Sequence, residues 1–283
     1  SILFNNAAVA VQVPYPDETT PIATTTHSTA QKNGWVWDIG LQHRRGVGHV
    51  FSKAFQSHEE TLQVLDQYLK ETGRPEGLED LNPRLLSFDP GYRKKFWVKN
   101  CLGIGLSAGF IEPLEASALV LVELSATAVA NQMPRDLNDM TVIADRFNRE
   151  FEARWSQIID FLKLHYVLSK RDDSAYWTHN RTDSSIPDTL QENLIVWANR
   201  APWYHDDLRR DEMFPAASYQ YVLYGMGFES RATFDALRAS EDKQSMAKQL
   251  FAETQKKAQK YGQFLPPTRF LMNQIREQDF ARI

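Results

Sequence analysis

Two carboxylates three positions apart, Glu112 and Glu115, are the side chains of this sequence best placed to act as a general acid or base. They follow a glycine-rich turn at 103–109 and stand at the head of an apolar segment with helical spacing from about Leu114 on. Acidic residues in a first helical turn are stabilised by the helix dipole, so a structural role would also explain them. The chemical alternative is a catalytic carboxylate beside a cofactor-binding turn.

The glycine turn is preceded by an apolar, strand-like run at 96–104. Strand, glycine turn and helix in this order suit the binding of a phosphate or a flavin, because glycines let backbone approach a ligand and a helix start offers free N–H groups. Gly103, Gly105 and Ala108 satisfy G-x-G-x-x-A, but we reject a dinucleotide-binding βαβ unit because no strand follows the helix. A turn needed only for a sharp bend is the structural alternative.

Trp35 and Trp37 alternate along an expected strand and therefore place two indoles on one face. Packing on a core is the ordinary explanation, and an aromatic wall beside a reactive centre is the functional one. We assign no metal, because the seven histidines show no metal-ligand spacing on a common helix. Ser107 and Ser117 lack a nucleophile elbow, which argues against serine hydrolysis.

Composition narrows the class of protein. The chain has 283 residues, 42% of them hydrophobic, which is enough for a sizeable core. A net charge of −4 implies no polyanion, so no nucleic-acid partner is expected. The single cysteine, Cys101, fits a reducing, cytoplasmic location. No apolar run reaches the ~18 residues that span a bilayer, and we expect neither a signal peptide nor a membrane partner.

Strands are expected first and helices later, which predicts an α+β fold with an antiparallel sheet. Ser57 and Glu60 have the spacing of a capping box at the start of the first helix, and Gly73 is placed to end it. The expected strands lie at 7–13, 22–30, 35–41, 46–51 and 84–88. The expected later helices lie at about 138–170, 188–199 and 241–260.

Three motifs, WVWDIG, NCLGIGLSAGFIEPLEASAL and SYQYVLYGMGF, together resemble those of the flavin-dependent tryptophan halogenase family. The family's W-x-W-x-I-P corresponds to 35–40, with Gly40 in place of proline. Its G-F-x-E-P-L-E-S-T-G corresponds to 109–118, with Ala116 in place of serine. The resemblance implies an antiparallel substrate-domain sheet and part of a flavin-monooxygenase-like FAD domain, followed by a largely helical C-terminal half.

The resemblance also implies roles for individual residues. It gives the part of catalytic glutamate to Glu115, and it places the halide at the backbone of Ser117 and Ala118. The residues expected to contact the flavin are Gly105, Leu106, Ser107, Ala108, Gly109 and Ile111. The residues expected to wall the substrate side are Trp35, Trp37, Phe110 and Phe214.

Two departures from the family pattern matter. Nothing in the first 34 residues supplies the family's N-terminal G-x-G-x-x-G and catalytic lysine, so we expect a C-terminal portion that works with a missing N-terminal segment of the same protein. Arg209 falls where the family has the glutamate that grips the amino group of tryptophan, so we expect a substrate other than free tryptophan. The expected regions are a substrate-side sheet with one helix at 1–95, a flavin-contacting strand, turn and helix at 96–133, and a helical substrate-covering region at 134–283.

The activity that the resemblance implies is halogenation by the complete protein. A separate flavin reductase would deliver reduced FAD. Oxygen and chloride or bromide would then give hypohalous acid, which would halogenate an indole-like or other electron-rich aromatic. Two alternatives stay open: a hydroxylating flavin monooxygenase relative and a non-catalytic protein that kept the fold. The oligomeric state is open too, with a homodimer as one option.

Overall fold

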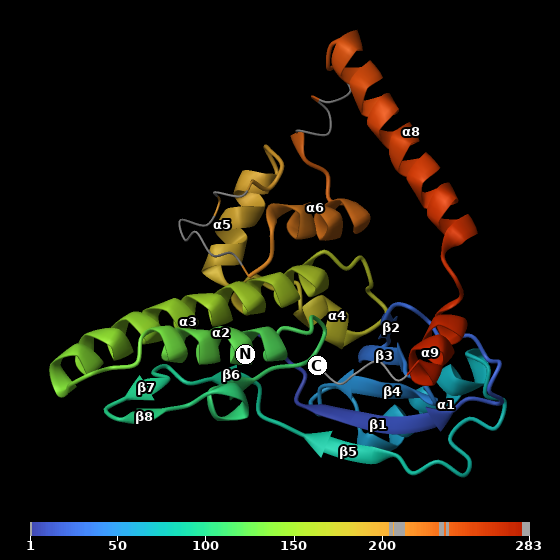
Figure 1. Ribbon diagram of the computed structural model, residues 1–283, viewed down its shortest axis with the longest axis horizontal. Coiled ribbons are helices and arrows are strands. Elements are labelled where there is room, and N and C mark those ends of the chain that lie inside the picture. The colour runs from blue at the N-terminus through green and yellow to red at the C-terminus, as the bar shows by residue number, and fades with distance from the viewer. Residues whose placement is uncertain (1, 204–205, 207–212, 232–234, 236–237, 279–283) are drawn as a thin grey trace.

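The computed structural model describes residues 2–203, 206, 213–231, 235 and 238–278. Strands dominate the early part of the chain and helices the later part, as the colour gradient of Figure 1 shows. A five-stranded antiparallel sheet followed by a largely helical half confirms the expected α+β class. Among the described residues, no helix has both the length and the apolarity needed to cross a membrane.

The sheet has the strand order β2-β3-β4-β1-β5. Its strands are β1 (Ala7–Pro14), β2 (His27–Gln31), β3 (Gly34–Gly40), β4 (Arg44–Phe51) and β5 (Arg84–Ser87). The expected strand at 22–30 is too long at its start. The ladder between β2 and β3 begins where His27 pairs with Asp38, so the threonines before His27 have the composition of a strand but no partner in the ladder.

Both faces of the sheet are covered. On one face, Val9 and Val36 pack against Leu65 and Leu69 of α1 (His58–Glu71). That helix begins with the expected capping box of Ser57 and Glu60. On the other face, side chains of β1, β3 and β4 join a core that includes the long helix α3 (Leu137–Val167). Residues of this second core are Ala8, Trp35, Val50, Phe147, Phe151, Trp155, Ile158 and Leu162.

The helical half is built around α3, which confirms the expected helix at about 138–170. Asp136 caps its first turn in a reciprocal capping box with Asp139. In Figure 1, α2 lies below α3 and the pair α5 and α6 lies above it. The other helices are α2 (Ala118–Asn131), α4 (Ala175–His179), α5 (Asp188–Trp197), α6 (Ala216–Gly225), α8 (Glu241–Phe264) and α9 (Thr268–Glu277), with short 3₁₀ turns η1 (Gly105–Ser107) and η2 (Asp183–Ser185).

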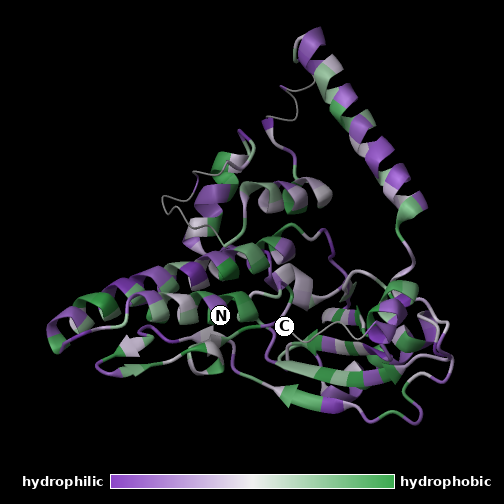
Figure 2. Cartoon of the chain, in the orientation of Figure 1, coloured by the Kyte–Doolittle hydropathy of each residue, from purple (hydrophilic) through white to green (hydrophobic). Residues whose placement is uncertain are grey.

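The two C-terminal helices, α8 and α9, lie apart from the helices around α3 (Figure 1). α8 stands apart from the other helices in Figure 1, and Figure 2 shows its surface as mostly hydrophilic with scattered hydrophobic residues. α9 returns to the sheet, where Arg269 donates hydrogen bonds to the carbonyls of Thr20 (2.9 Å) and Gln42 (2.5 Å). A helix after the two prolines at 266–267 was not expected from the sequence.

The expected single strand at 96–104 is wrong. It is a small hairpin of β7 (Trp97–Val98) and β8 (Cys101–Leu102), and Lys99 takes the left-handed φ of 54° at its turn. The side chain of Asn148 on α3 accepts hydrogen bonds from the amides of Phe96 and Trp97 and donates one to the Trp97 carbonyl. This contact with a distant helix holds the chain in a bend where its apolar composition favours an extended run.

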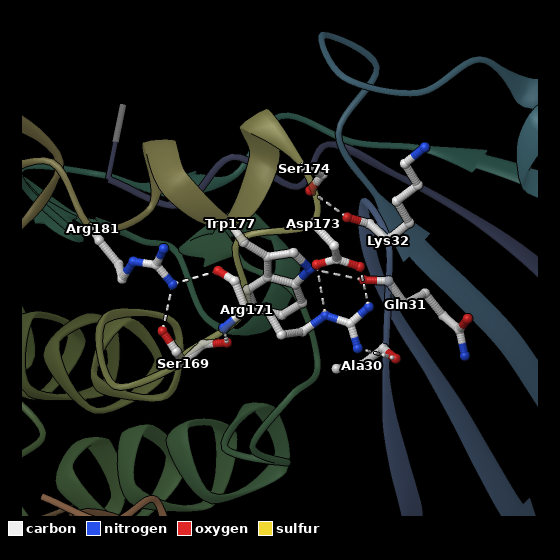
Figure 3. Close-up of polar contacts among 9 residues, drawn as sticks. All are labelled: Ala30, Gln31, Lys32, Ser169, Arg171, Asp173, Ser174, Trp177 and Arg181. Atoms are coloured by element: carbon white, nitrogen blue, oxygen red, sulfur yellow. Dashed lines mark hydrogen bonds and ion pairs between the residues drawn. The ribbon is translucent and has the colours of Figure 1, made fainter.

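The β2–β3 hairpin is attached to the helical half by the segment 169–181 (Figure 3). Trp177 donates its indole N–H to the carbonyl of Gln31 at 2.9 Å, and Ser174 donates its hydroxyl to the carbonyl of Lys32 at 2.5 Å. Arg171 lies over the Trp177 ring at 5.6 Å. These contacts fix the turn that leads into β3, and therefore bear on the strand that carries the paired indoles.

Candidate functional site

Glu112 is the most completely buried carboxylate of the described site, with 1% of its surface exposed. Its Oε2 atom accepts three hydrogen bonds, from Asn5 Nδ2 at 2.6 Å, Trp35 Nε1 at 2.8 Å and the Tyr166 hydroxyl at 2.6 Å. These donors come from the chain before β1, from β3 and from α3. One carboxylate oxygen therefore joins three segments that are far apart in the sequence.

The paired indoles lie together on the face of the sheet that meets this carboxylate. The Trp35 and Trp37 ring centroids are 6.3 Å apart, with 62° between the ring planes. Trp35 is buried and Trp37 is partly exposed. Trp37 lies opposite Gly48 of β4, where any Cβ would come within 2.2 Å of its indole. The small residue on the neighbouring strand is thus what lets the second indole lie flat on the sheet.

Glu115 occupies a different environment from Glu112. Its Oε1 lies 3.4 Å from Nε2 of His165 on α3, and its side chain is 36% exposed. The expectation that both carboxylates share the first turn of a helix is wrong, because α2 begins only at Ala118. The pairing of β9 (Gly109–Phe110) with β6 (Gly91–Tyr92) keeps the chain extended before it. The carboxylate that touches an indole is Glu112, and Glu115 faces α3.

A buried polar network continues from Glu112 along α3. Tyr176 donates its hydroxyl to Oδ1 of Asn5 at 3.1 Å. The ammonium group of Lys163 donates to Oδ1 of Asn180 at 2.8 Å and to the carbonyl of Ile2 at 3.0 Å, and it lies 4.7 Å above the ring of Phe4. Nearly every polar atom of this interior cluster has a partner, which is what makes such burial tolerable.

Burial dominates the protonation of this cluster. It raises the pKa of Glu112 above the ordinary value, although the hydrogen bonds from Tyr166, Trp35 and Asn5 act in the opposite direction. Burial also lowers the pKa of Lys163 to about 8, and the charge of Glu112 offsets part of that effect. The pKa of Tyr166 lies well above its usual range because of burial and the nearby carboxylate. Proton positions in this cluster are therefore set by the fold more than by bulk pH.

Part of the glycine turn and of α2 beside it is exposed and apolar. Gly105 takes a left-handed φ of +64°, and a Cβ there would meet only Val122 of α2 at 3.4 Å. Leu106 is 80% exposed beside it, and Leu119 of α2 is 81% exposed. Backbone amides with an apolar surface suit contact with an isoalloxazine edge and its ribityl chain, and these residues would hold that part of the cofactor.

Other parts of the expected turn already have structural partners. A Cβ on Gly109 would come within 2.7 Å of the Gly91 carbonyl, so its missing side chain is explained by strand pairing alone. The Ser107 hydroxyl donates to the carbonyl of Ile104 at 2.8 Å. Ala108 and Ile111 are buried in the core. The flavin contacts of these residues stay predictions, limited to their backbone.

The expected halide position lies at the start of α2. The amide of Ser117 donates to the carbonyl of Glu115 at 2.7 Å, so it is already used within the chain. Ala118 is the first residue of the helix, and the first amides of a helix have no partner inside it. Of the two amides predicted to bind the halide, the geometry therefore suits only that of Ala118.

The two expected wall residues outside the sheet lie apart from the indoles. Phe110 packs against Phe88, with 5.0 Å between ring centroids. Phe214 stacks on Phe161 of α3 with 4.0 Å between ring centroids, and the Phe161 ring also contacts His165 at 5.2 Å. Phe214 thus reaches the surroundings of Glu115 through two rings of α3. Arg209, the other residue expected to govern the substrate, lies outside the described residues.

Sequence reasoning missed the partners of both glutamates. Asn5, His165 and Tyr166 gave no sign of a role, and Glu112 was interpreted only as a helix-terminal acid. One local signal was present, because Glu112 lies between the apolar residues of 110–111 and Pro113, where an acid is unlikely to be a solvated surface group. The identity of the three donors could not come from local sequence.

Comparison with known proteins shows which family the chain matches. The family model described as tryptophan halogenase matches residues 1–242. The tryptophan 6-halogenase ThaL of Streptomyces albogriseolus is 29% identical over 286 aligned positions, which cover 96% of this chain and 52% of that protein.

Solved structures show the same fold. The tryptophan halogenase of Shewanella frigidimarina superposes with a TM-score of 0.91 at 44% identity, covering all of this chain and 53% of that one. BrvH, a flavin-dependent halogenase of Brevundimonas sp. BAL3, superposes with a TM-score of 0.80 at 33% identity, covering 96% of this chain and 52% of that one. The chain thus spans about half the length of these relatives. On the match over 242 of its 283 residues, the chain belongs to the tryptophan halogenase family.

Proposed function

We propose that the complete protein is a reduced-flavin-dependent halogenase that substitutes a ring hydrogen of an indole-like or other electron-rich aromatic with chlorine or bromine. One observation carries the proposal. The two glutamates of one short segment lie in different environments: the carboxylate of Glu115 is partly exposed, whereas the other glutamate is buried on the Trp35–Trp37 side. Family membership supports the same reaction, because the relatives that the chain resembles are halogenases.

The chemistry divides between the cofactor and this chain. Reduced FAD, delivered by a separate reductase, supplies with oxygen the oxidising power that turns halide into hypohalous acid. The chain's own part is to hold the substrate ring and to move one proton. The ring carbon forms its bond to the halogen, hydroxide leaves the halogen, and the ring proton passes to the Glu115 carboxylate. Glu115 then passes this proton to the released hydroxide, so the products are the halogenated ring and water, the carboxylate is restored, and Glu115 acts as general base.

The indole pair and the start of α2 have supporting parts in this scheme. Trp35 and Trp37 form a rigid apolar wall that favours aromatic substrates and excludes water. The amide of Ala118 is placed to bind an anion at the helix terminus. Because Arg209 would repel an ammonium group, we propose a substrate without the amino group of free tryptophan.

The test measures the mass of the product that forms in a mixture of the protein at its natural length, a flavin reductase, NADH and oxygen. Indole and free tryptophan are offered separately, with bromide or without halide. We expect a product with the bromine isotope pattern from indole, only when bromide is present, and much less from tryptophan. A product heavier by one oxygen would show a monooxygenase. Flavin that stays unbound, with no product from either substrate, would show a non-catalytic protein.

A further inference from the structure

Two consecutive residues of α3 contact the two glutamates of one short segment. Tyr166 donates its hydroxyl to Glu112 at 2.6 Å, and His165 faces Glu115 at 3.4 Å. Neighbouring residues on a helix point in directions about 100° apart. The 112–115 segment therefore bends around one turn of α3, with its first carboxylate directed to the interior and its second to the partly exposed side.

Glu112 cannot take part in chemistry at the substrate directly. Only 1% of its surface is exposed, and its nearest groups are Asn5, Trp35 and Tyr166. Its role is to hold other groups. Loss of this one acceptor would leave the Trp35 indole N–H and the Tyr166 hydroxyl without the acceptor they use, and Asn5 Nδ2 with only its 3.1 Å bond to the Tyr166 oxygen. Buried donors left unsatisfied are costly, so these contacts resist displacement.

The consequence for Glu115 follows from the short covalent distance between the two acids. Only Pro113 and Leu114 separate them, and the ring of Pro113 fixes its own φ near −65°. A shift of the Glu112 side chain would therefore also displace Glu115. The same shift would move the Trp35 indole, which is held by the same oxygen atom.

We propose that Glu112 is a positioning residue, which holds the Trp35 indole and the Glu115 carboxylate in one fixed relation through a single buried oxygen. The catalytic side of this inference rests on the proposed halogenase function. Its structural side, the anchoring of Trp35, stands independently of that function.

The test weakens the anchor by removing one hydroxyl, which donates to Glu112 and accepts from Asn5 at 3.1 Å, and keeps the core filled. Tyr166→Phe removes the hydroxyl that donates to Glu112. Tyr68→Phe is the matched control, because Tyr68 is also buried and also donates to a carboxylate, that of Asp38 at 3.2 Å. Glu112→Met is the stronger variant, because it keeps the length of the side chain and removes the oxygen that all three donors share, which a glutamine would retain. If it fails to fold, Tyr166→Phe still decides.

The first readout is the ¹⁹F NMR spectrum of the protein labelled with 5-fluorotryptophan. The seven tryptophans of this chain each contribute a signal, and the Trp35 signal is assigned from its absence in Trp35→Phe. We expect the Trp35 signal to shift and broaden in Tyr166→Phe and more strongly in Glu112→Met, and to stay in place in Tyr68→Phe. An unmoved Trp35 signal in Tyr166→Phe and in every folded Glu112→Met sample would overturn the anchoring.

The second readout is halogenation kinetics at natural length. A misplacement of about 1 Å costs up to ~10²-fold in rate, so we expect kcat to fall by roughly ten- to a hundredfold in Tyr166→Phe with KM changed far less. Equal losses in Tyr166→Phe and Tyr68→Phe would mean a general structural effect and would overturn the proposal. If the unmodified protein halogenates nothing, the proposed function fails, and the NMR shift alone decides whether Glu112 anchors Trp35.

Discussion

Nε2 of His165 lies 3.4 Å from Oε1 of Glu115, and the other ring nitrogen of that histidine lies 2.8 Å from the carbonyl oxygen of Phe161. A carbonyl only accepts, so Nδ1 carries a hydrogen and the ring is held by its own helix. Nε2 then faces the carboxylate from a fixed direction. Glu115 lies against α3 on one side and is partly open to solvent, so its carboxylate is accessible to a bound molecule.

The first prediction concerns Glu115 itself. Glu115→Gln keeps the size of the side chain and removes its capacity to take a proton. We expect halogenation at natural length to fall on the order of 10²- to 10⁴-fold, the usual contribution of a general base. Flavin binding, measured by fluorescence titration with FAD, is expected to stay within about twofold, because no flavin contact is assigned to this side chain.

The control for that experiment is Glu123→Gln. Glu123 is an exposed glutamate on α2, and replacing it changes the net charge by the same amount. It should halogenate at the rate of the unmodified protein. Substantial product from Glu115→Gln would contradict the role of general base.

The second prediction concerns the attachment of the β2–β3 hairpin. Trp177→Phe removes the hydrogen bond from the indole to the Gln31 carbonyl and keeps an aromatic ring under Arg171. We expect a loss of about 1–2 kcal/mol in the free energy of unfolding in urea. We also expect faster amide hydrogen exchange over residues 30–35, since the turn that leads into β3 loses a tie.

Trp197→Phe separates this local effect from a general one. It removes a similar indole hydrogen bond, to Asp206 at 2.9 Å, on α5. A comparable loss of stability with unchanged exchange over residues 30–35 is expected. If both variants raise the exchange of the hairpin alike, Trp177 is not its specific attachment.

Local sequence predicted those parts of the fold whose cause is local. The capping box of Ser57 and Glu60 and the apolar spacing of α3 each depend on residues a few positions apart, and both are confirmed. The paired indoles also follow from the two-residue repeat of a strand. Their contact, 6.3 Å between ring centroids, is the expected outcome of that repeat.

The parts that could not be predicted depend on distant partners. The apolar run at 96–104 would favour a strand, but Asn148 of α3 holds it in a hairpin. Glu112 has the sequence position of a helix-terminal acid, but Asn5, Trp35 and Tyr166 reach it from three other segments. No spacing rule connects these positions, so the inner half of the site became visible only in three dimensions.

The third prediction is a loss of stability in acid that comes from one histidine. His49 on β4 is fully buried, and among the described residues neither ring nitrogen has a hydrogen-bond partner. Burial lowers its pKa from 6.5 to about 4. Between these values the unfolded chain binds a proton and the folded chain does not. The free energy of unfolding therefore falls by ~1.4 kcal/mol per pH unit as pH drops from 6.5 towards 4.

His49→Leu removes this effect while filling a similar space. Urea unfolding of the unmodified protein and the variant at pH 7.5, 5.5 and 4.5 gives a difference curve in which the other titrating groups cancel. We expect the variant to gain relative stability at each step towards acid. His58→Leu, at an exposed position, should leave the slope in place because the buried imidazole is still there. Parallel curves for the unmodified protein and His49→Leu would refute the prediction.

The fourth prediction is a gain of stability in alkaline solution that comes from Lys163. Its amine is enclosed by Asn180, the Ile2 carbonyl and the Phe4 ring. Burial lowers its pKa from 10.5 to about 8. A neutral amine still has two hydrogens for its two acceptors, so the folded state tolerates loss of the proton. Above pH 8 the unfolded chain keeps a proton that the folded chain has released, and the free energy of unfolding rises by ~1.4 kcal/mol per pH unit towards 10.5.

The measurement is urea unfolding at pH 8.0, 8.5 and 9.0, where about a tenth or fewer of the tyrosines in the unfolded chain are ionised. The unmodified protein should gain stability over this range, and Lys163→Met should lose that gain because it has no amine to titrate. Lys53→Met is the matched control, since Lys53 is exposed and its amine donates to the Ser87 hydroxyl, and it should keep the gain. The same pH dependence in Lys163→Met and Lys53→Met would contradict the prediction. It would mean that the amine of Lys163 has the same pKa in the folded and the unfolded chain.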